Sequence, residues 1–176
     1  MPRKSQREPL LDAAEQLVLD EGVAALTLNG LARVAGVSKG GLLYHFESKA
    51  ALVAAMVERV AARFAEAQDR HVSKSGDAVR AYVDATFPKG RPARSREDRL
   101  GASLLAAYLN DPELLAPLRE RYEGWQERLE ASGDPVAATI VRLAVDGLWL
   151  ADLFGLAPPQ GKLRKQVLGR LREGSQ

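Results

Sequence analysis

Residues 27–52 read TLNGLARVAGVSKGGLLYHFESKAAL, and this stretch predicts two short helices that cross closely at a tight turn. A close crossing needs a small residue on the first helix, a residue that tolerates a positive φ in the turn, and an apolar anchor on the second helix. Ala32, Gly36 and Leu42 supply these residues in order. Their spacing is that of a DNA-binding helix-turn-helix, in which the second helix is held rigidly while its outer face stays free for the major groove.

Polar and basic residues surround the second of these helices. Thr27 and Ser38 stand at predicted N-cap positions, where free backbone N–H groups favour phosphate. Lys39, Tyr44 and Lys49 are residue types suited to phosphate contact. The outer side of the helix would present Lys39, Gly40, Gly41, Leu43, Tyr44 and His45. The net charge of the chain is only +2, so the prediction of DNA binding depends on where these residues stand.

Helical periodicity continues through the rest of the chain, and no alternating run of β-branched residues is long enough for a strand. The predicted fold class is therefore all-α, with about nine helices. The polar segment Val72–Asp77 breaks the helix that Ser48 begins, so this segment is a candidate domain junction. Further helices are expected over residues 77–87, 97–110, 112–132, 135–155 and 161–172, with a basic, proline-containing loop over 88–96.

The composition limits the classes of function. The 176 residues include no cysteine, which excludes disulfides, thiolate metal sites, thiol catalysis and a thiol redox switch. His45 and His71 do not form a metal-binding motif, and no nucleophile–base pair or carboxylate pair emerges, so we expect no metal, no cofactor and no enzyme activity. No apolar run reaches the roughly 20 residues of a membrane helix, and Met1 begins no signal peptide. A cytoplasmic protein with no membrane contact is expected.

From Thr27 to Leu52 the sequence closely resembles the DNA-binding segment of the TetR family of transcriptional regulators. The A-G-V-S turn, the G-x-L-x-x-H-F stretch and the S-K that opens the next helix fall in the family's register. The resemblance implies a three-helix DNA-binding domain at residues 1–50 and a helical ligand-binding and dimerisation domain at 51–176. By position, it implies phosphate contacts at Thr27 and Lys49, base or backbone contacts at Ser38, Lys39, Gly40 and Gly41, and contacts near other phosphates at Tyr44 and His45.

Two positions depart from the family's pattern. A tyrosine that reaches phosphate usually follows the apolar anchor, whereas this chain has Leu43 there and Tyr44 one residue later. One residue turns a helix by about 100°, so Tyr44 would approach the DNA backbone from an adjacent face. Gly41 stands at a typical base-reading position without a side chain, so base reading is expected to depend on its neighbours, the backbone or DNA shape.

The second half of the chain resembles the family in architecture. Aromatic residues in its apolar stripes are the first candidates for lining an inducer cavity, although such stripes usually form core: Tyr82, Phe87, Tyr108, Tyr122 and Trp125. The D-G-L-W-L segment that begins at Asp146 resembles the penultimate helix of the family's dimer bundle. Small residues there would let two helices approach beside large anchors, and the implied interface is Gly147, Trp149, Ala151, Phe154 and Gly155. The alternative is that this stripe packs inside the protomer.

Together these features predict a homodimeric, ligand-responsive transcriptional repressor. Two recognition helices would enter successive major grooves of a palindromic operator in double-stranded DNA. A small-molecule inducer, apolar or aromatic in character, would favour a conformer in which their spacing is changed. The alternative function is a helical protein that binds a small molecule or a partner and keeps an unused helix-turn-helix.

Overall fold

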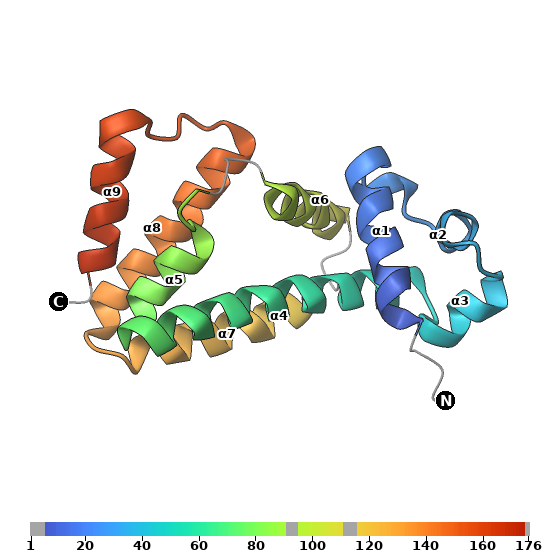
Figure 1. Ribbon diagram of the computed structural model, residues 1–176, viewed down its shortest axis with the longest axis horizontal. Helices are drawn as coiled ribbons and strands as arrows, with labels where there is room; N and C mark the ends of the chain where they lie inside the picture. The colour runs from blue at the N-terminus through green and yellow to red at the C-terminus, as the bar shows by residue number, and fades with distance from the viewer. Residues whose placement is uncertain (1–5, 91–94, 111–115, 175–176) are drawn as a thin grey trace. The chain divides into compact units, whose positions relative to one another are not determined.

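The computed structural model describes residues 6–90, 95–110 and 116–174, and of residues 106–110 it describes the backbone alone. These ranges hold nine α-helices and no β-strand (Figure 1), which confirms the predicted all-α class. No helix within them is long and apolar enough to cross a membrane. The elements in chain order are α1 (Arg7–Glu21), the 3-10 helix η1 (Val23–Ala25), α2 (Leu28–Ala35), α3 (Lys39–His45), α4 (Lys49–Ser75), α5 (Ala78–Thr86), α6 (Arg96–Asn110), α7 (Ala116–Glu130), α8 (Pro135–Phe154) and α9 (Gly161–Glu173).

The helix break predicted at Val72–Asp77 is narrower in the structure, because α4 continues to Ser75 and ends at Gly76, whose φ is 69°. The polar residues fit inside the last turns of α4, since the hydroxyls of Ser73 and Ser75 donate to the carbonyl oxygens of the residues four positions earlier. The element η1 was not predicted, because a three-residue segment has no measurable period. Residues 91–94 of the expected basic loop and 111–115 at the expected start of α7 lie outside the described residues.

The chain forms two compact units, Met1–Val60 with Arg96–Leu118, and Ala61–Ser95 with Arg119–Gln176. Helices α4 and α7 each contribute residues to both units, whereas α6 belongs to the first. The functional division at residues 50 and 51 that the resemblance implies stays a prediction.

The first unit is built around α1, which packs against α2, η1 and α6. Figure 1 shows α1, α2 and α3 grouped together. One face of α1 is apolar and buried. It joins a core of Leu10, Leu11, Ala14, Leu17 and Val18 from α1, Leu31, Leu42 and Phe46 from the helix-turn-helix region, Leu52, Val53 and Met56 from α4, and Leu100 and Leu104 from α6. This core fixes the inner side of α3 to the rest of the unit.

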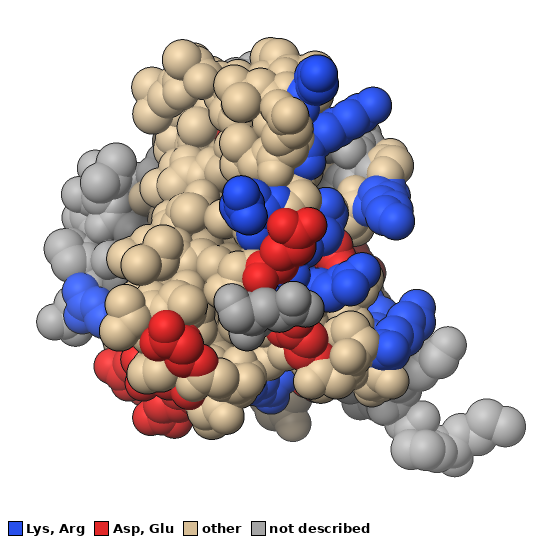
Figure 2. Space-filling model, turned by 90° about the vertical axis from the view of Figure 1, so that its left-hand side faces the viewer, with Lys and Arg blue, Asp and Glu red and all other residues tan. Residues whose placement is uncertain are grey.

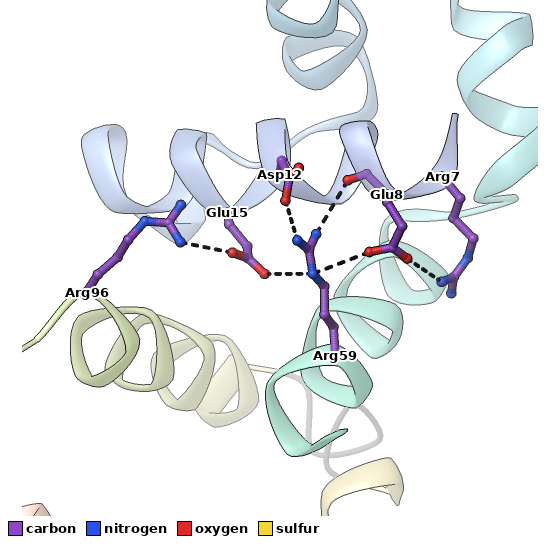
Figure 3. A network of polar contacts seen from close by, with 6 residues as sticks. All are labelled: Arg7, Glu8, Asp12, Glu15, Arg59 and Arg96. Atoms are coloured by element: carbon purple, nitrogen blue, oxygen red, sulfur yellow. Dashed lines mark hydrogen bonds and ion pairs between the residues drawn. The ribbon is translucent and has the colours of Figure 1, made fainter. Parts of the chain in front are cut away.

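A row of carboxylates on α1 faces two arginines from other helices (Figure 3). Glu8, Asp12 and Glu15 lie on one side of α1 because their positions differ by four and three residues. Arg59 of α4 contacts all three side chains, and its Nε lies 3.5 Å from both Glu8 Oε2 and Glu15 Oε1. Arg96 of α6 places Nη1 3.1 Å from Glu15 Oε2. The Glu15 side chain is only 1 % exposed, so its carboxylate joins α1 to α4 and α6 in a nearly dry site.

The variant Glu15→Gln is expected to destabilise the fold by about 2 kcal/mol, because two guanidinium groups would then face a neutral side chain in a buried site. Chemical unfolding followed by circular dichroism measures this loss. The matched control is Glu21→Gln, at an exposed position in the last turn of the same helix, which should change the free energy of unfolding by less than about 0.5 kcal/mol. Equal stability of the two variants would contradict the structural role of Glu15.

In the second unit α5 packs against α8 and α9 (Figure 1). The end of α9 approaches α8 closely, because a Cβ atom on Gly174 would lie 2.7 Å from Cγ2 of Val141. Two ion pairs also hold α9, one between Arg164 and Asp152 at 2.6 Å and one between Arg172 and Asp84 at 2.7 Å. The core of this unit contains Ala61, Val79, Tyr82, Val83, Trp125, Leu129, Ala138, Val141 and Val145.

Candidate functional site

The two short helices of the helix-turn-helix begin at the caps that the sequence predicts. The side-chain oxygen of Thr27 accepts a hydrogen bond from the N–H of Gly30 at 3.0 Å, and Ser38 Oγ accepts one from the N–H of Gly41 at 3.0 Å. Each hydroxyl uses a lone pair in its cap, so its own O–H stays free to donate to a phosphate oxygen. The caps at Thr27 and Ser38 are therefore confirmed, and they are compatible with the phosphate contacts predicted there.

The crossing between α2 and α3 has the predicted geometry. Gly36 ends α2 with a φ of 66°, in the left-handed region that glycine adopts without strain. Ala32 and Leu42 are both buried, one on each side of the crossing. The inner face of α3 is thereby fixed, and its outer face is left exposed.

The outer face of α3 exposes four of the residues predicted to contact DNA: Lys39, Gly40, Gly41 and Tyr44. The Tyr44 side chain is 86 % exposed, and its ring lies edge to face with the half-buried His45 ring at 5.1 Å between centroids. Leu43, which the sequence also places on the outer side, is 38 % exposed. A Cβ atom added at Gly40 would meet nothing within 4 Å, so the first turn of α3 is open to an approaching surface.

Three exposed cations in the helix-turn-helix region form no ion pair within the part of the chain that the structure describes: Arg33, Lys39 and Lys49. By contrast, Arg59 and Arg96 already contact carboxylates on α1. A cation without an ionic partner binds phosphate without losing an existing contact, so these three are the better candidates. The sequence analysis missed Arg33. Its signal was its position directly after Leu31 and Ala32, because these two residues face the core and the next residue on the helix is exposed.

A surface hollow of about 340 Å³ adjoins the end of α3, and Arg7, Leu43, Tyr44, His45, Phe46, Glu47 and Ala51 line it. The guanidinium of Arg7 lies 5.5 Å from the centroid of the Phe46 ring. The start of α1 therefore lies beside the end of α3, where the resemblance places Tyr44 and His45 near phosphates.

Aromatic rings lie together in the core of the second unit. Phe64 of α4 meets Tyr82 edge to face at 5.5 Å between centroids and Trp125 at 4.8 Å. Tyr122 lies 5.1 Å from Trp125. The structure thus brings together three of the residues predicted to contact a ligand and adds Phe64, which the sequence analysis missed. The feature of the sequence that could have indicated Phe64 is its position in a long apolar stripe along α4.

Of the other two predicted ligand residues, the structure describes the side chain of one. Phe87 packs against the same core cluster, and the guanidinium of Arg164 lies 5.4 Å from the centroid of its ring. The side chain of Tyr108 lies outside the described residues.

A chain of polar contacts runs beside the aromatic rings. The Tyr82 hydroxyl donates a hydrogen bond to Asp146 Oδ1 at 2.6 Å, and Arg142 Nη1 lies 3.0 Å from Asp146 Oδ2. Arg142 also donates to Gln126, and its guanidinium lies 5.9 Å from the centroid of the Tyr122 ring. Burial raises the pKa of the Asp146 carboxyl, against the opposing effects of Tyr82 and Arg142. Burial also raises the pKa of Tyr82, and it raises the pKa of Tyr122 to about 12, so both phenols are neutral.

The raised pKa of Asp146 predicts a pH dependence of stability. A carboxyl whose pKa is raised by folding contributes most to stability below its ordinary pKa of 3.8, and this contribution is lost as the pH rises through the folded-state pKa. The free energy of unfolding of the wild type, compared with Asp146→Asn, should therefore fall as the pH rises above 3.8, until the carboxyl is also ionised in the folded protein. Tyr82→Phe removes a hydrogen bond that favours the carboxylate, so in its background the loss should continue to higher pH and become larger. A difference that is constant with pH would contradict this assignment.

Two further features lie near the rings. A hollow of about 360 Å³ is lined by Tyr122, Glu123, Gln126, Glu127 and Arg142. On α4, Gln68 is buried, and its Nε2 donates to no partner within the described residues. Gln68 is four residues from both Phe64 and Val72, which pack against the aromatic core, so it lies on the same side of α4. A buried amide without a partner is unusual in a folded protein and is a candidate for contact with a ligand.

The outer face of α8 is apolar. Val136, Ile140, Leu143, Leu150 and Phe154 follow one another on it, with Gly147 at the middle, and these five side chains are 38–66 % exposed. The positions differ alternately by four and three residues, which is the period of a helix that packs against another helix. Such a continuous apolar stripe on a helix points to a covering partner.

The residues predicted for a dimer interface divide between different sides of α8. Gly147 and Phe154 lie on the apolar stripe, and Ala151, four residues after Gly147, flanks it. Gly155 ends the helix with a φ of 70°. Trp149 is two residues from Gly147 and therefore about 200° around the helix, on the side away from the stripe. The structure does not bring Trp149 together with the other four.

Figure 2 views the molecule from the side on which α9 lies in Figure 1. Lys and Arg side chains gather toward one edge of this face, and a wide area beside them carries few charges. Helix α9, which lies on this side in Figure 1, contains five cations: Lys162, Arg164, Lys165, Arg170 and Arg172. Leu163 of α9 is exposed, so this helix also carries an apolar side chain on the surface.

Comparison with known families covers most of the chain. The family described as bacterial regulatory proteins, tetR family, matches residues 10–56, and the tetracyclin repressor-like C-terminal domain matches residues 76–176. Together with the exposed α3, these matches define a DNA-binding transcriptional regulator of the helix-turn-helix class. The chain belongs to the TetR family of these regulators.

Individual relatives and solved structures agree with this assignment. The HTH-type transcriptional regulator BetI of Stenotrophomonas maltophilia is 27 % identical over 166 residues, which are 85 % of this chain and 84 % of that protein. The HTH-type transcriptional regulator TtgR of Pseudomonas putida is 40 % identical over 52 residues, 30 % of this chain and 25 % of that regulator. Among solved structures, the multidrug binding protein EbrR complexed with ethidium is 27 % identical with a TM-score of 0.75, and the similarity covers 95 % of this chain and 98 % of EbrR.

Proposed function

We propose that this regulator is a homodimeric repressor that holds a palindromic operator with two copies of α3 and releases it when a small molecule binds. The observation that carries the DNA-binding part is the exposed outer face of α3, whose inner face is locked by Leu42 and whose first turn is capped by Ser38. Lys39 and Lys49 have no ionic partner within the described ranges, and both are free to neutralise phosphates.

The proposed DNA contacts keep the set that the sequence indicates and add one cation. Thr27, Ser38, Lys39, Gly40, Gly41, Tyr44, His45 and Lys49 form the set, and Arg33 joins it. The half-buried His45 is the least accessible side chain in its part of α3 after the anchor Leu42, so we assign it to packing beneath Tyr44 as much as to DNA.

The proposed dimer forms through the apolar stripe of α8. Gly147 at the middle of the stripe lets a second helix approach closely, and the flanking Leu143 and Leu150 supply apolar contacts. Trp149 is left out of this interface because it lies on the other side of the helix. A two-fold dimer suits a palindromic operator because the symmetry of the protein matches that of the DNA.

The proposed effector is an aromatic compound that carries a positive charge. Phe64, Tyr82, Tyr122 and Trp125 offer ring faces, which attract cations, and ring edges, which pack against the faces of other aromatic rings. Glu123 and Glu127 line the hollow beside Tyr122, and Gln68 offers a buried donor. EbrR was crystallised with ethidium and with malachite green, both of them aromatic cations, which supports the same class of ligand for this chain.

The experiment that tests the proposal begins with selection of binding sites from a random pool of duplex DNA at low salt. The purified dimer should select a palindrome and bind it in an electrophoretic shift. Malachite green added to the complex should release the DNA, whereas free DNA measured alone controls for binding of the dye to the duplex. An intact dimer that selects no site would overturn the proposal and favour a small-molecule-binding protein with an unused helix-turn-helix.

A further inference from the structure

The side chains that α3 can offer to base edges are few. Gly40 and Gly41 have no side chains, Leu42 is buried, and the Ser38 hydroxyl already accepts the N–H of Gly41. The outward side chains are therefore Lys39, Leu43 and Tyr44, with His45 beneath Tyr44. Lys39 can donate to guanine, but none of them is the arginine, asparagine or glutamine that forms paired hydrogen bonds with guanine or adenine in the major groove.

Leu43 and Tyr44 share a face of α3 with Gly40. They are three and four residues after it, and residues at these separations are neighbours on a helix surface. Leu43 is 38 % and Tyr44 is 86 % exposed, and both line the hollow of about 340 Å³ at the end of the helix. Because a Cβ at position 40 would meet nothing and none is present, the backbone of this face can come close to a base edge and carry Leu43 and Tyr44 with it.

We propose that Leu43 and Tyr44 read the C5-methyl groups of thymine in the operator, so that base recognition by this regulator depends mainly on apolar contact. This inference rests on the proposed function, in which α3 enters the major groove. The thymine methyl is the apolar group that the major groove presents, and contact with it distinguishes thymine from the other bases. Lys39 supplies the hydrogen-bonding share of recognition, through guanine or through phosphate.

The inference separates Tyr44 from a purely phosphate-binding tyrosine. A phosphate contact needs the phenolic hydroxyl and gives no preference for a base, whereas a methyl contact needs the ring and gives one. Tyr44→Phe should therefore keep the preference for thymine, and Tyr44→Ala should weaken it.

The experiment removes single methyl groups from the DNA. In the selected operator, each thymine of the half-sites is replaced in turn by deoxyuridine, which keeps the base pair and lacks only the methyl group. At one or more positions the wild-type protein should lose affinity by about 4-fold for one half-site and about 15-fold for both, the value expected for one buried methyl group per half-site. The loss at that position should disappear in Leu43→Ala or in Tyr44→Ala, and it should persist in Val34→Ala, an exposed apolar residue of α2 that serves as the matched control.

The possible outcomes test the reading of thymine methyl groups separately from the proposed function. Operators without thymine in their half-sites, deoxyuridine operators that bind as tightly as the originals, or a loss that persists in both alanine variants would overturn this inference and leave the proposed function standing. Failure to select any DNA would instead overturn the proposed function. Thermal unfolding of each variant tests whether its fold is intact. An intact fold is expected, because the side chains of Leu43 and Tyr44 are exposed.

Discussion

Leu143→Glu is expected to produce a folded monomer that binds the operator at least about 100-fold more weakly than the wild type, because two linked half-site contacts become one. The side chain of Leu143 is exposed in the protomer, so glutamate there disturbs no core contact. In a dimer formed through α8, the same position lies within the apolar stripe, where a buried carboxylate without a partner strongly opposes association. Sedimentation measures the oligomeric state, and titration of labelled operator measures the affinity.

Leu143→Met is the matched control for this variant. It keeps an apolar side chain of similar volume, so it should remain dimeric and bind the operator within about 3-fold of the wild type. A dimer that survives Leu143→Glu with full operator affinity would rule out the stripe of α8 as the interface and point to a different contact.

Lys39→Ala and Lys49→Ala are each expected to weaken binding by about tenfold or more at about 0.1 M salt, on the operator and on unrelated duplexes alike. A dimer loses two phosphate contacts with each substitution. The slope of log affinity against log salt concentration should therefore become shallower by about 2. Fluorescence anisotropy of a labelled duplex over a series of salt concentrations gives both quantities.

The control for the lysine variants is Lys165→Ala, which removes an exposed cation of α9 in the second unit. Its affinity and salt slope should match those of the wild type. If Lys39→Ala changed the affinity for one sequence only and left the salt slope unchanged, Lys39 would be a base contact and not a phosphate contact.

The helix-turn-helix was predictable because its determinants are local. The caps of Thr27 and Ser38 act on residues three positions away, and the positive φ of Gly36 belongs to a single turn. A sequence displays such short-range requirements directly. The half-burial of His45 was less predictable, since its neighbour Phe46 joins a core that residues of several other helices form.

The sequence did not predict which apolar face of α8 is buried in the protomer. Val141, Val145 and Leu148 are buried inside the protomer, whereas Ile140, Leu143 and Leu150 lie on the outer face. Both sets have a helical period, and a period alone does not say which set faces the protomer core. The small residues at four-residue spacing predicted the region of α8 in which the stripe lies. The same prediction included Trp149, which lies on the side of the helix away from the stripe.

Contacts between distant parts of the chain were not predictable. Tyr82 and Asp146 are 64 residues apart, and only the packing of α5 on α8 brings them to 2.6 Å. Glu15 is likewise an ordinary helix residue in the sequence, and its contacts with Arg59 and Arg96 come from two other helices.

The empty first turn of α3 bears on how the regulator diverges during evolution. Alanine at position 40 would favour the helix over glycine by less than the roughly 1 kcal/mol of a helix interior, and a Cβ there meets no other atom of the protein within 4 Å. In the proposed complex, a single codon change at Gly40 would thus replace the close approach of the backbone to DNA with a side chain, without weakening the fold. After gene duplication, one copy could acquire a new set of target genes without passing through an unstable intermediate.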